Sequence, residues 1–212
     1  MQNEPFAKER PMTLILPSLF SELERPALKT IVNELSQASY IGEIVIGQPD
    51  SEETWLGPLV SAKAANDAVA FQDKLLELGG KALIKLDVQD AGPAFVSPGL
   101  VDMTNATGKL DEECFGPLLQ VWRVADFDEA LRVANDTKYG LAAGLVSERA
   151  DLWEMFRATI RAGVVNWNRM TVGASGALPF GGPGWSGNHA PGGSYAADYC
   201  AWPMASLTAE RV

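Results

Sequence analysis

The sequence predicts an α/β domain in which a mostly parallel sheet is flanked by helices. Two observations carry this prediction. Short apolar segments of strand length alternate along the chain with longer segments whose apolar residues recur at helical spacing. A chain of 212 residues, 47% of them hydrophobic, also has enough apolar side chains for one sizeable core. This alternation is typical of helices packed on the faces of a sheet.

The N-terminal part of the chain has a β-α-β pattern. Residues 13–16 form an apolar run that ends at a proline, which predicts a short strand. Residues 21–24 read Ser-Glu-Leu-Glu, which is typical of a helix N-terminus, and we expect that helix to continue to about residue 37. Residues 43–46 then return as a strand.

A longer amphipathic helix is expected next, over residues 61–78. Alanine, valine, phenylalanine and leucine recur there at helical spacing, and Gly79 and Gly80 form an ordinary C-terminal cap. The remaining regular elements are strands at residues 81–86, 117–124, 141–146 and 163–167 and helices at residues 128–135 and 151–161.

Composition excludes several classes of function. The formal net charge is -10, from 27 acidic and 17 basic residues, which argues against a nucleic-acid or anionic-membrane partner. Apolar runs are too short for a membrane span and the N-terminus is polar, so we expect a cytoplasmic protein. Two isolated cysteines and the single His189 provide neither a disulfide framework nor a metal site.

The C-terminal part of the chain changes character twice. Glycine, serine, proline and alanine dominate residues 171–194, which predicts a long loop or linker. Residues 195–207 read YAADYCAWPMASL and are too apolar and aromatic to remain in water. We therefore expect this tail to pack on another subunit of a homo-oligomer or on a missing-domain partner.

An ordered series of short motifs resembles one family. From residue 47 to about residue 207 the chain is similar to the C-terminal third of the NAD-dependent aldehyde dehydrogenases, and within that family to the succinylglutamate semialdehyde dehydrogenases of bacterial arginine catabolism. The motifs are GQPD at 47–50, GPL at 57–59, DEECFGPLLQVWR at 111–123, GVVNWN at 163–168, PFGGPGWSGNH at 179–189, and the tail YAADYCAWPMASL.

The resemblance implies roles for four residues. Glu113 is expected to accept hydrogen bonds from the ribose next to the nicotinamide of NAD, and Phe115 to pack near the nicotinamide ring. Without the motif, the same residues read as a surface carboxylate and a core aromatic. Arg169 is expected to pair with a substrate carboxylate, with a solvated loop arginine as the alternative. Phe180 is expected to line the aldehyde pocket or to anchor its loop.

The resemblance also implies an aldehyde oxidation that this chain does not complete. In the family a cysteine thiolate attacks the aldehyde, hydride passes to NAD, and water hydrolyses the thioester. Glu77 in LELGGK looks like the family's general base, but it follows GPL, whereas the family's glutamate precedes it; a helix end explains the pattern. Cys114 lies beside two carboxylates, which raise a thiol pKa, and Cys200 lies in the apolar tail. We expect no catalytic residue, no tight NAD binding and no activity from the chain alone.

Two departures from the family remain. SGNH is followed by Ala190 where the related enzymes usually have arginine, which weakens an assignment of substrate binding there. Residues 1–47 instead resemble the opening β-α-β of a glucosylglycerate-synthase-like glycosyltransferase; Asp126 and Asp128 have the letters of its Asp-x-Asp metal motif but stand where helix caps are ordinary. We therefore expect a substituted segment at 1–47, a partial catalytic domain at 48–194 and a tail at 195–212. The alternatives are a non-catalytic oligomerising module and a glycosyltransferase relic.

Overall fold

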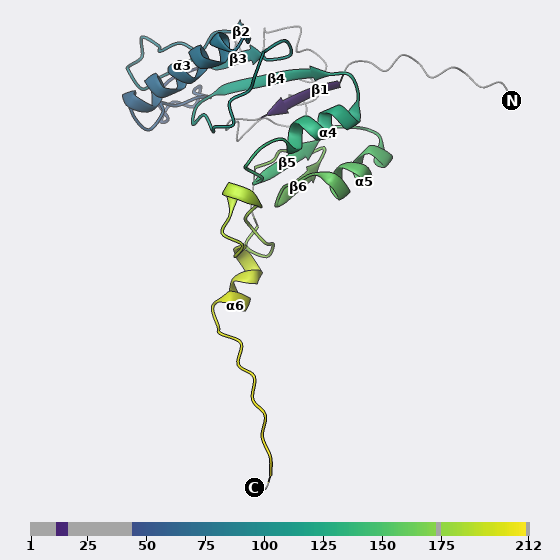
Figure 1. The fold of residues 1–212 in the computed structure, drawn as a ribbon. Coiled ribbons are helices and arrows are strands. Elements are labelled where there is room, and N and C mark those ends of the chain that lie inside the picture. The colour runs from purple at the N-terminus through teal and green to yellow at the C-terminus, as the bar shows by residue number, and fades with distance from the viewer. Residues whose placement is uncertain (1–11, 17–43, 173–174, 211–212) are drawn as a thin grey trace, which may run out of the picture. The chain divides into compact units, whose positions relative to one another are not determined.

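The computed structural model describes residues 12–16, 44–172 and 175–210, in two compact units that divide between residues 136 and 137. The first unit holds a four-stranded sheet in the order β1-β4-β3-β2. The second holds a two-stranded sheet of β5 and β6 and the long C-terminal loop (Figure 1). Strands and helices share each unit, so the predicted α/β class is confirmed.

The four-stranded sheet is mixed. Its strands are β1 (Met12–Leu16), β2 (Lys81–Ile84), β3 (Gly99–Asp102) and β4 (Leu118–Val124). Only the β3–β4 pair is parallel, whereas β1–β4 and β2–β3 are antiparallel. Residues 85–98 return the chain from β2 to β3 without a helix, so the neighbouring strand runs in the opposite direction. The parallel character that the alternation predicted therefore holds for one pair of this sheet.

Helix α3 (Ala62–Glu77) covers one face of the sheet. The Ser61 Oγ accepts a hydrogen bond from the Ala64 N–H at the N-terminus, and Gly79, at φ 92°, ends the helix as predicted. Its buried face packs in the main hydrophobic core. In this core, helix residues Ala65, Ala68, Phe71 and Leu75 cluster with Leu86, Val96, Val101, Met103, Cys114 and Leu118. A smaller cluster of Leu100, Leu119 and Val121 lies on the opposite face.

One buried side chain in this core was not anticipated. Gln72 is completely buried, yet its amide accepts a hydrogen bond from the Leu86 N–H at 2.7 Å and donates to the Leu86 carbonyl at 3.1 Å. It therefore supplies both backbone partners that Leu86 lacks just after β2. This pair ties α3 to the chain that leaves the sheet.

Helix α4 (Phe127–Asn135) packs against β1 and β4. Asp126 is its N-cap, because Asp126 Oδ1 accepts from the Glu129 N–H and the Glu129 side chain accepts from the Ala125 N–H, each at 2.8 Å. This capping box confirms that Asp126 and Asp128 belong to a helix start. Within the described ranges, no group of three or more His, Cys, Asp or Glu side chains is arranged to hold a metal ion.

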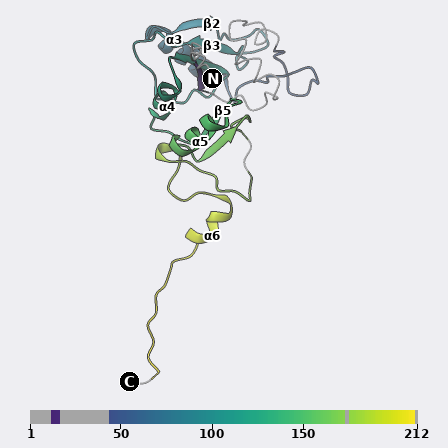
Figure 2. The same cartoon turned by 90° about the vertical axis from the view of Figure 1, so that its right-hand side faces the viewer.

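The second unit pairs β5 (Ala142–Leu145) with β6 (Val164–Trp167) in parallel, linked by α5 (Ala150–Thr159). This is the β-α-β pattern that the sequence predicted. Residues 175–195 form an irregular loop with two short 3-10 turns, followed by α6 (Ala196–Tyr199). Beyond α6 the chain extends away from the rest of its own unit (Figure 2), with Trp202, Met204 and Leu207 at least 90% exposed.

Several predicted elements differ or cannot be compared. The helix predicted at residues 21–37 lies outside the described residues, and the strand predicted at 43–46 is reduced to a single bridge between Ile46 and Leu56. Strand β3 was missed, because a strand of only four residues that begins at a glycine after Pro98 gives little periodicity. In the part of the chain that the structure describes, no helix has the length and apolar character of a membrane span.

Candidate functional site

Residues 112–117 form the turn that leads into β4. Cys114 is buried in the cluster beneath α3, whereas Glu113 and Phe115 on either side of it are exposed. The Gly116 N–H donates to the Cys114 carbonyl at 2.9 Å, and a Cβ on Gly116 would lie only 2.9 Å from that of Ala68 in α3. Glycine thus lets the turn lie against α3. Cys114 anchors the turn, and the turn presents Glu113 and Phe115 to solvent.

The turn presents a carboxylate and an aromatic ring side by side to solvent. Phe115 is 67% exposed, so the alternative of a core aromatic is wrong. An exposed carboxylate can accept hydrogen bonds from two ribose hydroxyls, and an exposed ring beside it can pack on a planar base. The diphosphate end has no counterpart among the described helices, since α3, α4 and α5 begin at Ser61, Asp126 and Arg149 without a Gly-rich turn.

The two cysteines lie in different surroundings. Burial raises the pKa of the Cys114 thiol to about 11, so the thiolate is scarce at neutral pH. The cause is desolvation, which corrects the expectation that the neighbouring carboxylates raise this pKa: the Glu113 side chain is exposed to water, where its charge is screened. Cys200 is exposed at the end of α6. Glu77, the apparent general base, is exposed in the last turn of α3.

In the second unit the loop that begins with Pro-Phe-Gly-Gly at residues 179–182, called the PFGG loop, lies directly against the starts of β5 and β6. A Cβ on Gly163 would lie 1.6 Å from the Gly181 carbonyl oxygen, and a Cβ on Gly182 would lie 2.1 Å from the Gly140 carbonyl oxygen. The Gly140 N–H also donates to Ser186 Oγ at 3.0 Å. Backbone therefore meets backbone at this crossing, which only glycine allows.

Gly184 in the same loop also lies against the backbone of a distant segment. Gly184 has φ 62°, and a Cβ there would lie 2.1 Å from the Lys138 carbonyl oxygen. The Trp185 N–H donates to that same oxygen at 2.8 Å, and the Lys138 ammonium lies 4.3 Å from the centre of the Trp185 ring. A residue with a Cβ does not fit this backbone at position 184.

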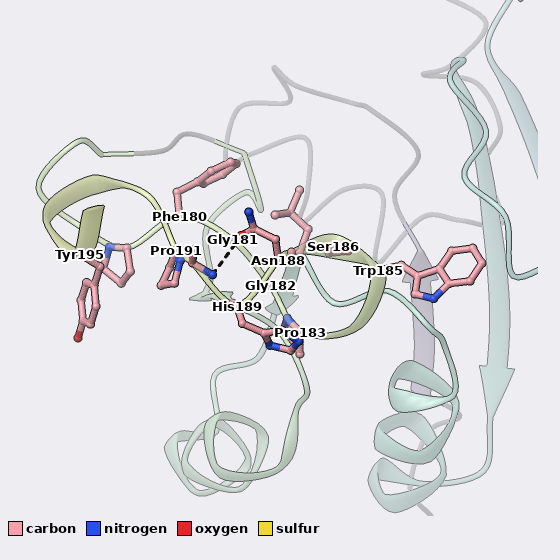
Figure 3. Close-up of a pocket in the computed structure, with 15 residues that line it drawn as sticks. Phe180, Gly181, Gly182, Pro183, Trp185, Ser186, Asn188, His189, Pro191 and Tyr195 are labelled. Carbon is pink, nitrogen blue, oxygen red and sulfur yellow. Dashed lines mark hydrogen bonds between the residues drawn. The ribbon is translucent and has the colours of Figure 1, made fainter. Parts of the chain in front are cut away.

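A pocket of about 790 Å³ opens beside this loop. Phe180, which is 48% exposed, lines it together with Asn188, His189 and Tyr195. Figure 3 shows Phe180 and Tyr195 well separated from Trp185, which lies toward the other end. His189 has the left-handed φ of 64°, which is uncommon for a residue with a side chain. Phe180, which was predicted to line the aldehyde pocket or to anchor its loop, is one of the residues that line this cavity.

Arg169 lies elsewhere in the same unit. It follows β6 at an exposed turn and is not among the residues that line the pocket. Glu113 and Phe115 belong to the first unit, whereas Arg169 and Phe180 belong to the second. Sequence reasoning did not assign a role to Asn166 or Asn168, whose amides bond the backbone around Arg169. Their placement on either side of a strand's last residue was the available signal, because asparagine favours turns.

Comparison with known proteins gives the family. The model of the aldehyde dehydrogenase family matches residues 24–202. The chain is 49% identical over 170 residues to an N-succinylglutamate 5-semialdehyde dehydrogenase of Paraburkholderia xenovorans, covering 80% of this chain and 35% of that protein. It is 52% identical over 160 residues to the protein of the same name in Burkholderia multivorans, covering 76% and 33%. The chain thus spans about a third of the length of the curated relatives it matches.

Solved structures show the same relationship. Aldehyde dehydrogenase 21 from Physcomitrella patens, in complex with the reaction product succinate, matches with TM-score 0.69 and 27% identity, covering 80% of this chain and 35% of that one. A 1-pyrroline-5-carboxylate dehydrogenase from Thermus with bound NAD matches with TM-score 0.67 and 31% identity, covering 80% and 32%. The family match begins at residue 24, inside the segment expected to be glycosyltransferase-like, and nothing found supports that likeness. The chain belongs to the aldehyde dehydrogenase family.

Proposed function

We propose that this chain forms part of an NAD-dependent dehydrogenase for N-succinylglutamate semialdehyde and does not turn over alone. The observation that carries the proposal is the identity of 49–52% to dehydrogenases named for that substrate. The chain spans about a third of their length, so the whole reaction requires residues beyond those described here. NAD, when bound, accepts the hydride of the aldehyde.

The first unit is proposed to bind the cofactor and the second unit to bind the substrate. Glu113 and Phe115, exposed on the turn before β4, bind the nicotinamide ribose and ring. Phe180 lines the pocket that receives the aldehyde chain, and Arg169 binds a carboxylate of the substrate. The buried, protonated Cys114 and the exposed Cys200 supply no activated thiol. The nucleophile, the general base and the diphosphate site would therefore have to come from residues outside the ones described.

Fragment complementation tests this proposal. The part of the Paraburkholderia xenovorans protein that lies outside the match is co-expressed with this chain, and NADH formation is followed with N-succinylglutamate semialdehyde. We expect activity from the mixture and none from either part. Glu113→Gln in this chain is expected to raise the KM for NAD about tenfold, because the amide accepts fewer hydrogen bonds from the ribose.

Glu112 provides the matched control. It is exposed next to Glu113, and its carboxylate lies 3.8 Å from the Lys74 ammonium, away from any proposed ligand role. Glu112→Gln is expected to leave the KM for NAD unchanged. Equal effects of the two substitutions, or a mixture that assembles without forming NADH, would overturn the proposal.

A second function is favoured by one observation, the exposed tail. Trp202, Met204 and Leu207 are 93%, 90% and 102% exposed, and isolated chains rarely leave such a series of apolar side chains in water. The chain would then act as an oligomerising module through residues 201–210. Sedimentation of the whole chain beside a variant shortened after Cys200 tests this: a monomer in both cases would exclude it.

A further inference from the structure

The turn that carries Arg169 is held by two asparagine side chains. Asn166 Nδ2 donates to the Met170 carbonyl at 2.6 Å, on the C-terminal side of Arg169. Asn168, on the N-terminal side, accepts from the Ser147 N–H and donates to the Ser147 carbonyl, each at 2.9 Å. Three hydrogen bonds thus fix the backbone immediately before and after Arg169.

Asn168 continues the sheet with its side chain. Parallel pairing of β5 and β6 ends at Leu145 and Trp167, and the Asn168 N–H still donates to the Leu145 carbonyl at 2.8 Å. From there the Asn168 amide takes the place of a backbone peptide against Ser147. Its own φ of 52° turns the chain out of the sheet, a conformation that asparagine tolerates better than other side chains.

Ser147 is itself held in place. Its carbonyl also accepts from Trp167 Nε1 at 2.9 Å, and the Trp167 ring stacks on Trp153 of α5 with ring centres 5.6 Å apart and planes within 8°. The asparagine bonds therefore connect Arg169 to the packed layer of β6 and α5.

The Arg169 side chain, in contrast, is exposed, and its guanidinium makes no hydrogen bond or ion pair with the residues that the structure describes. A guanidinium on a fixed backbone with free donors is suited to bind a carboxylate through two parallel hydrogen bonds. Holding the backbone beforehand lowers the entropy that binding would otherwise cost. The substrate class of the proposed function, an N-succinylated amino acid semialdehyde, has two such carboxylates.

We propose that Asn166 and Asn168 are positioning residues that hold Arg169 for one carboxylate of the substrate. This inference rests on the proposed function, since it takes the substrate class from there. It also gives a physical reason for the sequence Asn-Trp-Asn-Arg at residues 166–169. The two asparagine amides fix the turn, the tryptophan connects the turn to α5, and the arginine binds the substrate carboxylate. Neither asparagine is expected to touch the substrate.

The experiment measures binding of N-succinyl-L-glutamate, the unreactive product that keeps the substrate's two carboxylates and has a third in place of the aldehyde, to the whole chain by calorimetry and ligand-observed NMR. Arg169→Ala is expected to weaken binding ~10–100-fold, the range for hydrogen bonds between charged groups. Asn168→Gly keeps the left-handed backbone but loses both bonds to Ser147, and it is expected to weaken binding about fivefold. Asn105→Ala, at an exposed asparagine of the other unit, serves as the control and is expected to change nothing.

A double-substitution cycle separates positioning from a general structural role. In the Arg169→Ala background, Asn168→Gly is expected to have no further effect, because the group that it positions is absent. An equal loss with and without Arg169 would show that Asn168 acts through the fold alone. Unchanged binding in Asn168→Gly, or no saturable binding by the original chain, would overturn this inference. The complementation assay judges the proposed function separately.

Discussion

The crossing of Gly163 and Gly181 predicts a large effect from a single methyl group. In Gly163→Ala the new Cβ would lie 1.6 Å from the Gly181 carbonyl oxygen and 2.6 Å from its carbon. Real Cβ atoms essentially never approach closer than 3.0 Å, so the PFGG loop must withdraw by at least about 1.4 Å. That displacement moves Phe180, the residue next to the crossing, away from its place in the pocket.

The cost can be estimated from two contributions. Forcing a methyl group into a filled space typically costs about 1–3 kcal/mol. Withdrawal of the loop also strains the bond from the Gly140 N–H to Ser186 Oγ, 3.0 Å long, and a lost hydrogen bond costs about 0.5–1.5 kcal/mol. We therefore expect a loss of about 2–4 kcal/mol in the free energy of unfolding.

Urea denaturation gives the stability, and amide hydrogen exchange at Gly140 and Trp185 reports the loop locally. Gly176→Ala is the matched control, because a Cβ there meets nothing within 4 Å. We expect faster exchange at both amides in Gly163→Ala only. A stability within about 0.5 kcal/mol of the control, with exchange unchanged, would refute the reasoning.

Three further predictions concern the first unit. Gln72→Ala leaves the buried N–H and carbonyl of Leu86 without partners and is expected to cost about 3–5 kcal/mol in urea denaturation. Asp126→Ala removes the cap of α4 and is expected to cost about 1 kcal/mol in the same assay. Because burial raises the pKa of Cys114 from 9.0 to about 11, the unfolded chain loses that proton first, so stability is expected to fall as pH rises from 9 toward 11, by up to about 1.4 kcal/mol per pH unit.

Each of these has its own control. Asp73→Ala, at an exposed position of α3 next to Gln72, is expected to change stability by less than about 0.5 kcal/mol, and an equal loss there would contradict the role of the buried amide. Helix α4 offers a second comparison, since Asp128→Ala leaves the cap intact. For Cys114, the difference in pH dependence between the original chain and Cys114→Ala isolates the thiol; identical slopes above pH 9 would contradict its burial effect.

The fold was predictable from the sequence where the pattern is local. The amphipathic spacing and the Gly79 cap located α3, and the alternation of elements located β5, α5 and β6. Pairing direction was not predictable, because it depends on how residues 85–98 return the chain to β3. The buried role of Gln72 was also hidden, since glutamine is usually exposed and only the tertiary position of Leu86 requires it.

The sequence motifs named candidate site residues, but the surroundings of those residues could not be predicted. The motifs predicted Glu113 and Phe115, and the structure shows both exposed around the buried Cys114. Sequence reasoning gave the right direction for the Cys114 pKa from the wrong cause, because burial cannot be read from neighbours in the chain. The clamp of Asn168 on Ser147 joins residues 21 positions apart, which no local pattern reports.

The central claim is that this chain supplies binding residues but no activated thiol. Its most direct test is NADH formation by the purified 212-residue chain with NAD and N-succinylglutamate semialdehyde, beside a variant carrying Cys114→Ala and Cys200→Ala. The account predicts no NADH above background from either protein. Turnover by the original chain that the double variant abolishes would contradict it, because one of the two cysteines would then be the nucleophile.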